Sequence, residues 1–427
     1  MINDPKDWII NRKKIATSKE RSAVLDILCA GYDALDTANV IRDNVILDGS
    51  TLFIMGQYFD LDDFKNLYVI GIGKASCTAA LALERILGSR IKDGFIIDKQ
   101  INGACKYLTT FKGTHPRPSQ DNVNAAGHIV ELASKIKKDD LVITIVSGGG
   151  SALLCWPQSE CDQGTKLYDA SLMTEWTIHE LNTVRKHTSQ LKGGGLAKLL
   201  FPASIIGLIF CDIPGDVFED VASGPTYKDE STVKDAFELL REHDLEEEFV
   251  LTETPKNNKY FKKVTNIPLI SNKQALRAMA AKAWEFKFKP YIFRRPLYDF
   301  ADTAIKKLLK HAKPNTVIVG GGEIKMKGKP DKDARGGRNQ FFTLAALDHI
   351  RKNQTFISCA SDGIDNSDAA GAIIDKKTLA KIKKLKLSTD KYRESWDTYP
   401  FFEKIGDLIF TGATGTNVAD LQILLTK

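Results

Sequence analysis

The stretch DDLVITIVSGGGSALL, residues Asp139 to Leu154, decides the fold class: an unbroken apolar run, then three glycines between two serines, then helix-like sequence. A short apolar run that ends in glycine is typical of a strand buried on both faces. Glycines let a backbone approach a ligand closely, and the N–H groups of a starting helix attract phosphate or carboxylate. We therefore predict an anion-binding loop here, the alternative being a tight turn without a ligand. The predicted contact residues are Ser147, Gly148, Gly149, Gly150 and Ser151.

The same order of apolar strand and glycine turn recurs along the chain, in NLYVIGIGKAS (Asn66 to Ser76), ASIIGLIFCDIPGD (Ala203 to Asp216) and NTVIVGGGEIKM (Asn315 to Met326). Apolar strands that alternate with helices predict parallel sheets covered by helices on both faces. Ligands of such sheets bind at the carboxyl ends of the strands, where these turns lie. The fold class is therefore α/β.

Chain length and composition predict two such domains. With 427 residues the chain exceeds the size of one compact core. A charged stretch from about residue 227 to residue 265 carries Pro255 and no glycine loop, so the boundary is expected there. We predict two three-layer α/β domains at residues 1–250 and 265–427, with a first helix that packs on either of them.

Composition also excludes several classes of protein. The net charge is only +6, and lysine-rich pieces such as residues 375–387 have the spacing of a solvated helix face, which argues against nucleic-acid binding. The seven cysteines include no C-x-x-C pair, which argues against a disulfide framework and a zinc site. No apolar run of about 18 residues and no signal peptide are visible, so a cytoplasmic protein without a membrane segment is expected.

Lys74 lies in the strand-to-helix turn GIGKAS, where its flexible ammonium can reach a phosphate as a point charge. The turn is not a Walker A motif, because Tyr68 and Ala75 stand where that motif needs glycine and a hydroxyl. It is not G-x-G-x-x-G either, because Ser76 replaces the third glycine, which weakens a nicotinamide or flavin interpretation. A lone lysine in a turn is ordinarily a surface residue.

The segment LNTVRKHTSQLKGGGLAKLL, Leu181 to Leu200, is either a solvated turn or a grip for an anion. Its position in the chain, between two other candidate anion loops, favours the grip. Lys186 and His187 are expected to face water. The predicted ligand contacts are Asn182, Arg185 and Lys192.

Further candidates are an arginine and two aspartates. Arg338 follows two glycines in ARGGRNQ and offers a guanidinium fork for carboxylate or phosphate, unless it forms a structural ion pair. Asp216 and Asp362 follow strands and are predicted metal ligands, because a magnesium ion that bridges phosphates needs one or two protein carboxylates; helix capping is the alternative. His115 and His187 belong to no hydrolase or zinc-protease motif.

In this order, the motifs resemble those of the two-domain glycerate 2-kinases, whose carboxyl-terminal part is the MOFRL domain. The motifs are GIGKAS, THPRPSQDN, SGGGSALL, NTVRKH with LKGGGLA, DIPGD with ASGPT, GGRNQ, SDGIDNSDAAGA and TGATGTNVADL. The resemblance implies a Rossmann-like first domain with a mainly parallel sheet, and an active cleft between the domains. It further implies ATP-dependent phosphorylation of D-glycerate at the 2-hydroxyl, with Mg²⁺ or another divalent cation. Lys74 and Arg338 correspond to residues regarded as active-site residues in relatives.

Other interpretations stay open at this point. A hydroxypyruvate reductase that uses NAD(P)H fits the sheet pattern and a small hydroxy acid, and a non-enzymatic sensor of small acids would use the same cleft. The expected partners are D-glycerate and a nucleotide, without nucleic acid or membrane, and a homodimer is compatible with the sequence.

Overall fold

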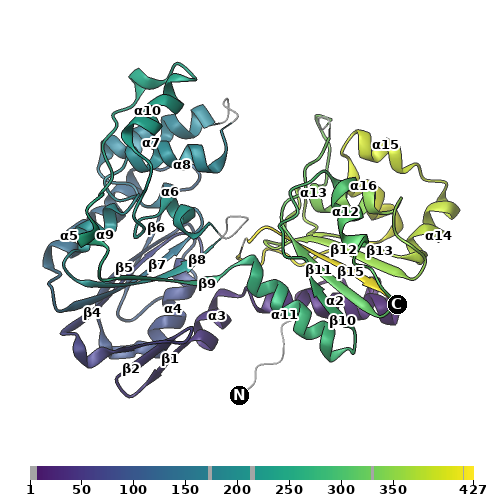
Figure 1. The fold of residues 1–427 in the computed structure, drawn as a ribbon, viewed down its shortest axis with the longest axis horizontal. Coiled ribbons are helices and arrows are strands. Elements are labelled where there is room, and N and C mark those ends of the chain that lie inside the picture. Colours follow the sequence, from purple (N-terminus) through teal and green to yellow (C-terminus); the bar gives the residue numbers. More distant parts are fainter. Residues whose placement is uncertain (1–6, 172–175, 212–216, 328–330, 417) are drawn as a thin grey trace. The chain divides into compact units, whose positions relative to one another are not determined.

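The computed structural model describes residues 7–171, 176–211, 217–327, 331–416 and 418–427. The chain forms two compact units (Figure 1). The first unit comprises Thr37–Ile213 and Val217–Ile270, and the second unit comprises Met1–Asp36 and Ser271–Lys427. None of the helices in the described ranges is long and apolar enough to cross a membrane.

The first unit is built on a six-stranded sheet in the order β6-β5-β4-β7-β8-β9, in which every pair of neighbouring strands is parallel. The chain starts in the middle, at β4, moves to one edge, and then crosses to β7. This is the doubly wound order, in which ligands bind where the winding reverses. The predicted Rossmann-like parallel sheet is confirmed. The strands are β4 (Asn66–Ile72), β5 (Ile91–Asp98), β6 (Thr109–Lys112), β7 (Asp140–Ser147), β8 (Ser204–Phe210) and β9 (Val264–Ile270).

Apolar side chains on both faces of this sheet explain its three layers. On β4, Tyr68, Ile70 and Ile72 share a core with helices α5 and α9. Helix α4 packs against the strands β4, β5 and β7, and every residue of β7 is buried. Each fully buried aliphatic side chain contributes about 1.5–3 kcal/mol to folding. The helices are α3 (Thr37–Asn44), α4 (Ser76–Leu87), α5 (Gln120–Lys135), α6 (Gly150–Leu153), α7 (Gln158–Ser171), α8 (Ile178–His187), α9 (Gly195–Leu200) and α10 (Val233–Arg241).

A small antiparallel sheet of β1 (Val45–Asp48), β2 (Thr51–Ile54) and β3 (Gln57–Asp60) precedes β4 in the first unit. Helix α3 and β1 both pack against α4. This sheet therefore extends the layer that α4 forms, away from the strand ends at which ligands of the large sheet are expected.

The second unit contains a mixed six-stranded sheet in the order β10-β11-β15-β12-β13-β14. Only β10 and β11 pair in parallel, so the prediction of a parallel sheet is wrong for this unit. The reason is that a short, wholly apolar strand has the same residue pattern in either direction. The strands are β10 (Lys289–Ile292), β11 (Thr316–Gly321), β12 (Gln354–Ala360), β13 (Gly371–Ile374), β14 (Leu408–Ile409) and β15 (Asp420–Thr426).

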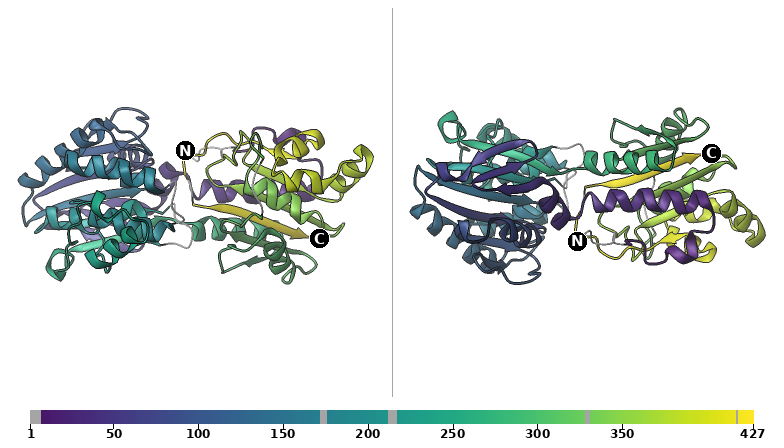
Figure 2. Two further views of the ribbon diagram at one scale, coloured as in Figure 1. Left: turned by 90° about the horizontal axis from the view of Figure 1, so that it is seen from above. Right: turned by 90° about the horizontal axis from the view of Figure 1, so that it is seen from below.

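Helices also cover both faces of the second sheet. Helices α2 (Lys19–Asp33) and α11 (Asn272–Glu285) pack against each other; α2 contacts β15 and α11 contacts β11. Figure 2 shows α2, in purple, beside the yellow β15. Helix α13 contacts β12 and β13 and packs against α12 and α16. The remaining helices are α1 (Arg12–Ile15), α12 (Ala301–Leu309), α13 (Arg338–Ala346), α14 (Lys376–Leu385), α15 (Thr389–Glu394) and α16 (Thr398–Ile405).

The amino-terminal helix belongs to the second unit, a point that the sequence left open. Arg21 on α2 is fully buried, and its guanidinium donates to Asp375 at 2.9 Å and to Asp407 at 2.9 Å. At the other end of the first unit, β9 hydrogen-bonds to β8, so that unit continues past the boundary expected between residues 250 and 265.

Candidate active site

The turn with Lys74 and the loop that starts at Ser147 meet where the winding of the first sheet reverses, after β4 and β7. The backbone N–H of Lys74 donates to the carbonyl of Gly148 at 2.9 Å. The Ser147 hydroxyl accepts from the N–H of Ala75 at 3.2 Å, which joins the two loops. Gly73, with φ +118°, lies so close that a Cβ there would be 2.2 Å from Ser147 Oγ. This contact requires glycine at position 73.

The Lys74 side chain extends over the Ser147 loop. A Cβ on Gly149 would lie 2.8 Å from Lys74 Cε and 3.1 Å from His115 Cδ2, so both side chains lie beside that glycine. Lys74 is exposed, and no residue in the described part of the chain forms an ion pair or a side-chain hydrogen bond with it. The ammonium is therefore available to an anion held at this loop.

Arg185 on α8 is a second cation at this end of the sheet. Its guanidinium donates to Asn182 Oδ1 at 3.4 Å, and no carboxylate of the described residues pairs with it. Burial lowers the pKa of Arg185 to about 10. It lines a small cavity of about 30 Å³ together with Ser151. A cation that has lost water without gaining an acidic partner is destabilised until an anion binds it.

Asn182 holds Arg185 in place. Its amide oxygen accepts both from Arg185 and, at 3.0 Å, from the Ser223 hydroxyl. Ser223 in turn lies 2.8 Å from the Ser151 hydroxyl, so a chain of hydrogen bonds runs from the Ser147 loop to Arg185. Asn182 is only 1% exposed. Because Asn182 is buried and hydrogen-bonded to Arg185, we assign it to orienting Arg185 and not to contacting a ligand.

Lys192 and the glycine run that follows it take part in packing. The Lys192 ammonium pairs with Glu160 and donates to the carbonyl of Leu154 at 2.8 Å. The N–H of Gly193 donates to Ser223, and a Cβ on Gly195 would lie 2.1 Å from the carbonyl oxygen of Gln190. These donors are already used within the protein, so we assign this turn to chain packing and not to an anion.

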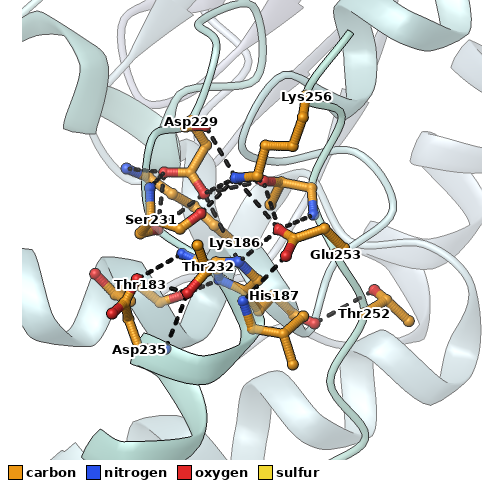
Figure 3. Close-up of polar contacts among 12 residues, drawn as sticks. Thr183, Lys186, His187, Asp229, Ser231, Thr232, Asp235, Thr252, Glu253 and Lys256 are labelled. Carbon is orange, nitrogen blue, oxygen red and sulfur yellow. Dashed lines mark hydrogen bonds and ion pairs between the residues drawn. The ribbon is translucent and has the colours of Figure 1, made fainter.

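Lys186 and His187 are buried, and the prediction that they face water is wrong (Figure 3). Lys186 Nζ lies 3.0 Å from Asp220 and 3.5 Å from Asp229. His187 Nε2 lies 3.3 Å from Glu253. Although burial raises the pKa of Asp229, Lys186 and neighbouring donors lower it below its usual range. These partners lie more than 30 residues away in the chain, so the local charge pattern did not reveal them.

Arg338 begins α13 in the second unit and lines a cavity of about 310 Å³. It forms an ion pair with Glu323. Although burial lowers the pKa of Arg338, the charges of Glu323, Asp420 and Asp365 raise it overall. The predicted alternative of a structural ion pair is therefore present, and a ligand carboxylate would have to displace Glu323.

Two buried aspartates organise this cavity. Asp365 accepts from the backbone N–H groups of Asn339 at 3.0 Å and Gln340 at 2.8 Å, and so caps α13. The Asn339 side chain donates to Asp420 at 2.8 Å. Burial raises the pKa of both aspartates. Asp420 is the one charged residue of β15, and this charge at the start of a buried strand was the sequence signal that could have identified it.

The two predicted metal ligands, Asp362 and Asp216, stay predictions. Asp362 lines the Arg338 cavity, where its carboxylate accepts from the N–H of Ile364 at 3.0 Å. Asp216 lies outside the described residues. The described ranges contain no group of three or more acidic, histidine or cysteine side chains arranged to hold a metal ion. Because Mg²⁺ at phosphates needs only one or two protein carboxylates, Asp362 alone remains compatible with it, and we derive no step from the metal.

Comparison with known proteins places the chain in a family. Residues 23–252 match a family described as a domain of unknown function, DUF4147, and residues 316–420 match the MOFRL family. The glycerate 2-kinase of Pyrococcus horikoshii is 32% identical over 95% of this chain and 97% of its own length. The solved structure of glycerate kinase from Thermotoga maritima matches with a TM-score of 0.83 at 27% identity, covering 95% of this chain and 99% of that chain.

A protein of Agrobacterium vitis with the provisional name hydroxypyruvate reductase is 33% identical over 84% of this chain and 98% of its own length. The two family matches follow each other along the chain in the order expected from the motifs. The chain belongs to the glycerate 2-kinase family, with a DUF4147 part followed by a MOFRL part.

Proposed function

We propose that the protein transfers the γ-phosphoryl group of ATP to the 2-hydroxyl of D-glycerate, giving 2-phosphoglycerate and ADP. The observation that carries the proposal is the pair of cations, Lys74 and Arg185, that face the Ser147 loop without a carboxylate partner among the described residues. They lie at the reversal point of a doubly wound sheet, where this class of fold binds its ligands. Membership in the glycerate 2-kinase family supports phosphorylation of glycerate as the reaction.

Phosphoryl transfer needs in-line placement of the reactants and neutralisation of charge more than covalent help from the protein. Lys74 and the loop from Ser147 to Ser151 are assigned to the transferring phosphate, because an exposed ammonium and a glycine-rich helix start both favour phosphate oxygens. Mg²⁺, when bound, neutralises phosphate charge; Asp362 and Asp216 are the candidate ligands.

The arginines are assigned to the carboxylate or the phosphates of the substrates. Arg185 offers a guanidinium that no acid of the described residues occupies. Arg338 is already paired with Glu323, so it would bind an anion only by exchanging one carboxylate for another. Of the two, Arg185 is therefore the stronger anion-binding residue.

A coupled assay with D-glycerate, ATP and Mg²⁺ tests the proposal, with ADP release as the readout. The position of the new phosphate is read by ³¹P and ¹³C NMR. Phosphate on the 2-oxygen supports the proposal. Phosphate on the 3-oxygen, or no ADP release above that seen without glycerate, contradicts it.

The reductase interpretation has one observation in its favour, the provisional name of the Agrobacterium vitis relative. Against it, Ser76 occupies the third glycine position of the turn after β4 and is buried, with its hydroxyl donating to the carbonyl of Gly73 at 2.7 Å. The loss of NADH absorbance with hydroxypyruvate, measured on the same preparation, decides between the two reactions.

A further inference from the structure

His115 lies on a loop that is fixed at both ends. The N–H of Thr114 donates to Asn122 Oδ1 at 2.8 Å, and the Asn122 amide donates back to Thr114 at 2.9 Å and to the carbonyl of Ala152 at 2.8 Å. Asn122 is fully buried. On the other side, Arg117 forms an ion pair with Asp169. The loop is thereby tied to the helix that follows the Ser147 loop, which holds the imidazole beside that loop.

The surroundings of His115 are cationic. Its ring lies beside Gly149 together with the Lys74 side chain. Burial, followed by the charges of Lys74, Lys99 and Arg185, lowers the pKa of His115 to about 4. At neutral pH the imidazole is therefore uncharged, and one ring nitrogen carries a lone pair. No residue in the described part of the chain hydrogen-bonds to the ring, which leaves that nitrogen available.

Two carboxylates at this end of the sheet are engaged elsewhere. Asp98, after β5, accepts from the N–H of Cys77 at 2.9 Å and so fixes the start of α4. Glu160 pairs with Lys192. The neutral imidazole of His115 thus offers an unoccupied basic nitrogen beside the Ser147 loop.

We propose that His115 accepts the proton of the substrate hydroxyl during phosphoryl transfer, an inference that rests on the proposed kinase function. As the hydroxyl oxygen forms its bond to the γ-phosphorus, the bond from that phosphorus to the β,γ-bridging oxygen breaks, and its electron pair leaves with ADP. The hydroxyl proton moves to the free ring nitrogen of His115 and is then released to water. General bases contribute about 10²–10⁴-fold to such a step, and His115, with its pKa lowered to about 4, belongs at the lower end of that range.

The test compares H115A and H115Q with the wild type in the ADP-release assay, with and without added imidazole. We expect kcat to fall about 10²-fold in both variants, with KM values for ATP and D-glycerate changed by less than about threefold. Imidazole should restore activity to H115A, because a soluble base can enter the space, and it should leave the wild type unchanged. The control is H128A, which removes an exposed histidine on α5 that stacks on Phe111.

The outcomes separate this inference from the proposed function. A wild type that does not phosphorylate glycerate overturns the function and this inference with it. A wild type that does, with H115A and H115Q near its kcat, overturns the role of His115 alone. If both variants lose activity, melt like the wild type and show no imidazole rescue, His115 positions the site without accepting the proton, and the inference is again overturned.

Discussion

Arg185 and Arg338 are both arginines that the sequence nominated for anions, but they have opposite surroundings. Arg338 faces Glu323, Asp365 and Asp420, which together raise its pKa. Arg185 has no acidic partner among the described residues, and burial lowers its pKa to about 10. Arg338 is therefore satisfied by the protein itself, whereas Arg185 needs a ligand. The position of a cation in a motif is thus a poorer guide to ligand binding than the acids around it.

The largest expected effect comes from removing the exposed cation over the Ser147 loop. Lys74→Met should lower kcat/KM about 10³-fold, the loss typical of one preorganised group at a developing charge. Lys138→Met is the matched control, because Lys138 is also exposed but lies just before β7, at the opposite end of that strand from the Ser147 loop. Steady-state kinetics check both variants. Equal activity in the two would show that Lys74 does not hold phosphate.

Lys186, a buried and paired cation on α8, should affect stability, whereas Arg185 should affect activity. Lys186→Met removes the buried ammonium that Asp220 and Asp229 share, and leaves Asp220 with only His179 at 3.1 Å and Asp229 with Lys256 at 3.6 Å. Removing one partner of a buried ion pair costs about 3–5 kcal/mol of unfolding free energy. Urea unfolding measures this loss of stability. The substitution should leave the KM of the folded enzyme unchanged. A fully stable Lys186→Met protein would contradict the structural role.

Releasing Arg338 from its acid tests whether that residue binds substrate at all. Glu323→Gln keeps the shape of the side chain but removes the charge that pairs with Arg338. If Arg338 contacts glycerate, the KM of Glu323→Gln for D-glycerate should be about fivefold lower than that of the wild type, equivalent to about 1 kcal/mol. An unchanged KM would place Arg338 among structural residues. Asp302→Asn, which alters an exposed ion pair with His349, is the control.

The smallest effect concerns Asp420 and appears as a dependence on pH. Because the folded state raises the pKa of Asp420, it binds the proton more tightly than the unfolded chain. This stabilisation is complete below about pH 4, the pKa of an unfolded aspartate, and is lost as pH rises through the folded pKa. Asp420→Asn should therefore become more stable relative to the wild type as pH rises from 4 to 8. A constant difference in urea unfolding across that range would contradict the raised pKa.

The sequence predicted the first sheet well, because most of its apolar strands are followed by helices, which is the order of a parallel sheet. It did not reveal the direction of the strands in the second sheet, where every residue of β12 and β15 is buried. The sequence also did not show that Lys192 has an acidic partner, whereas Arg185 has none among the described residues. The acid that occupies Lys192 is Glu160, 32 residues away, and such distant pairs are visible only in the folded chain.

The central claim is that Arg185 is kept without an acidic partner in order to bind a substrate anion. Arg185→Met tests it most directly, with kcat/KM and melting temperature measured on the same preparation. The account predicts that kcat/KM falls about 10²-fold. It also predicts that the melting temperature stays equal or rises, because an unpaired, desolvated charge has been removed. Wild-type activity, or a melting temperature that falls as it does in Lys186→Met, would contradict the claim.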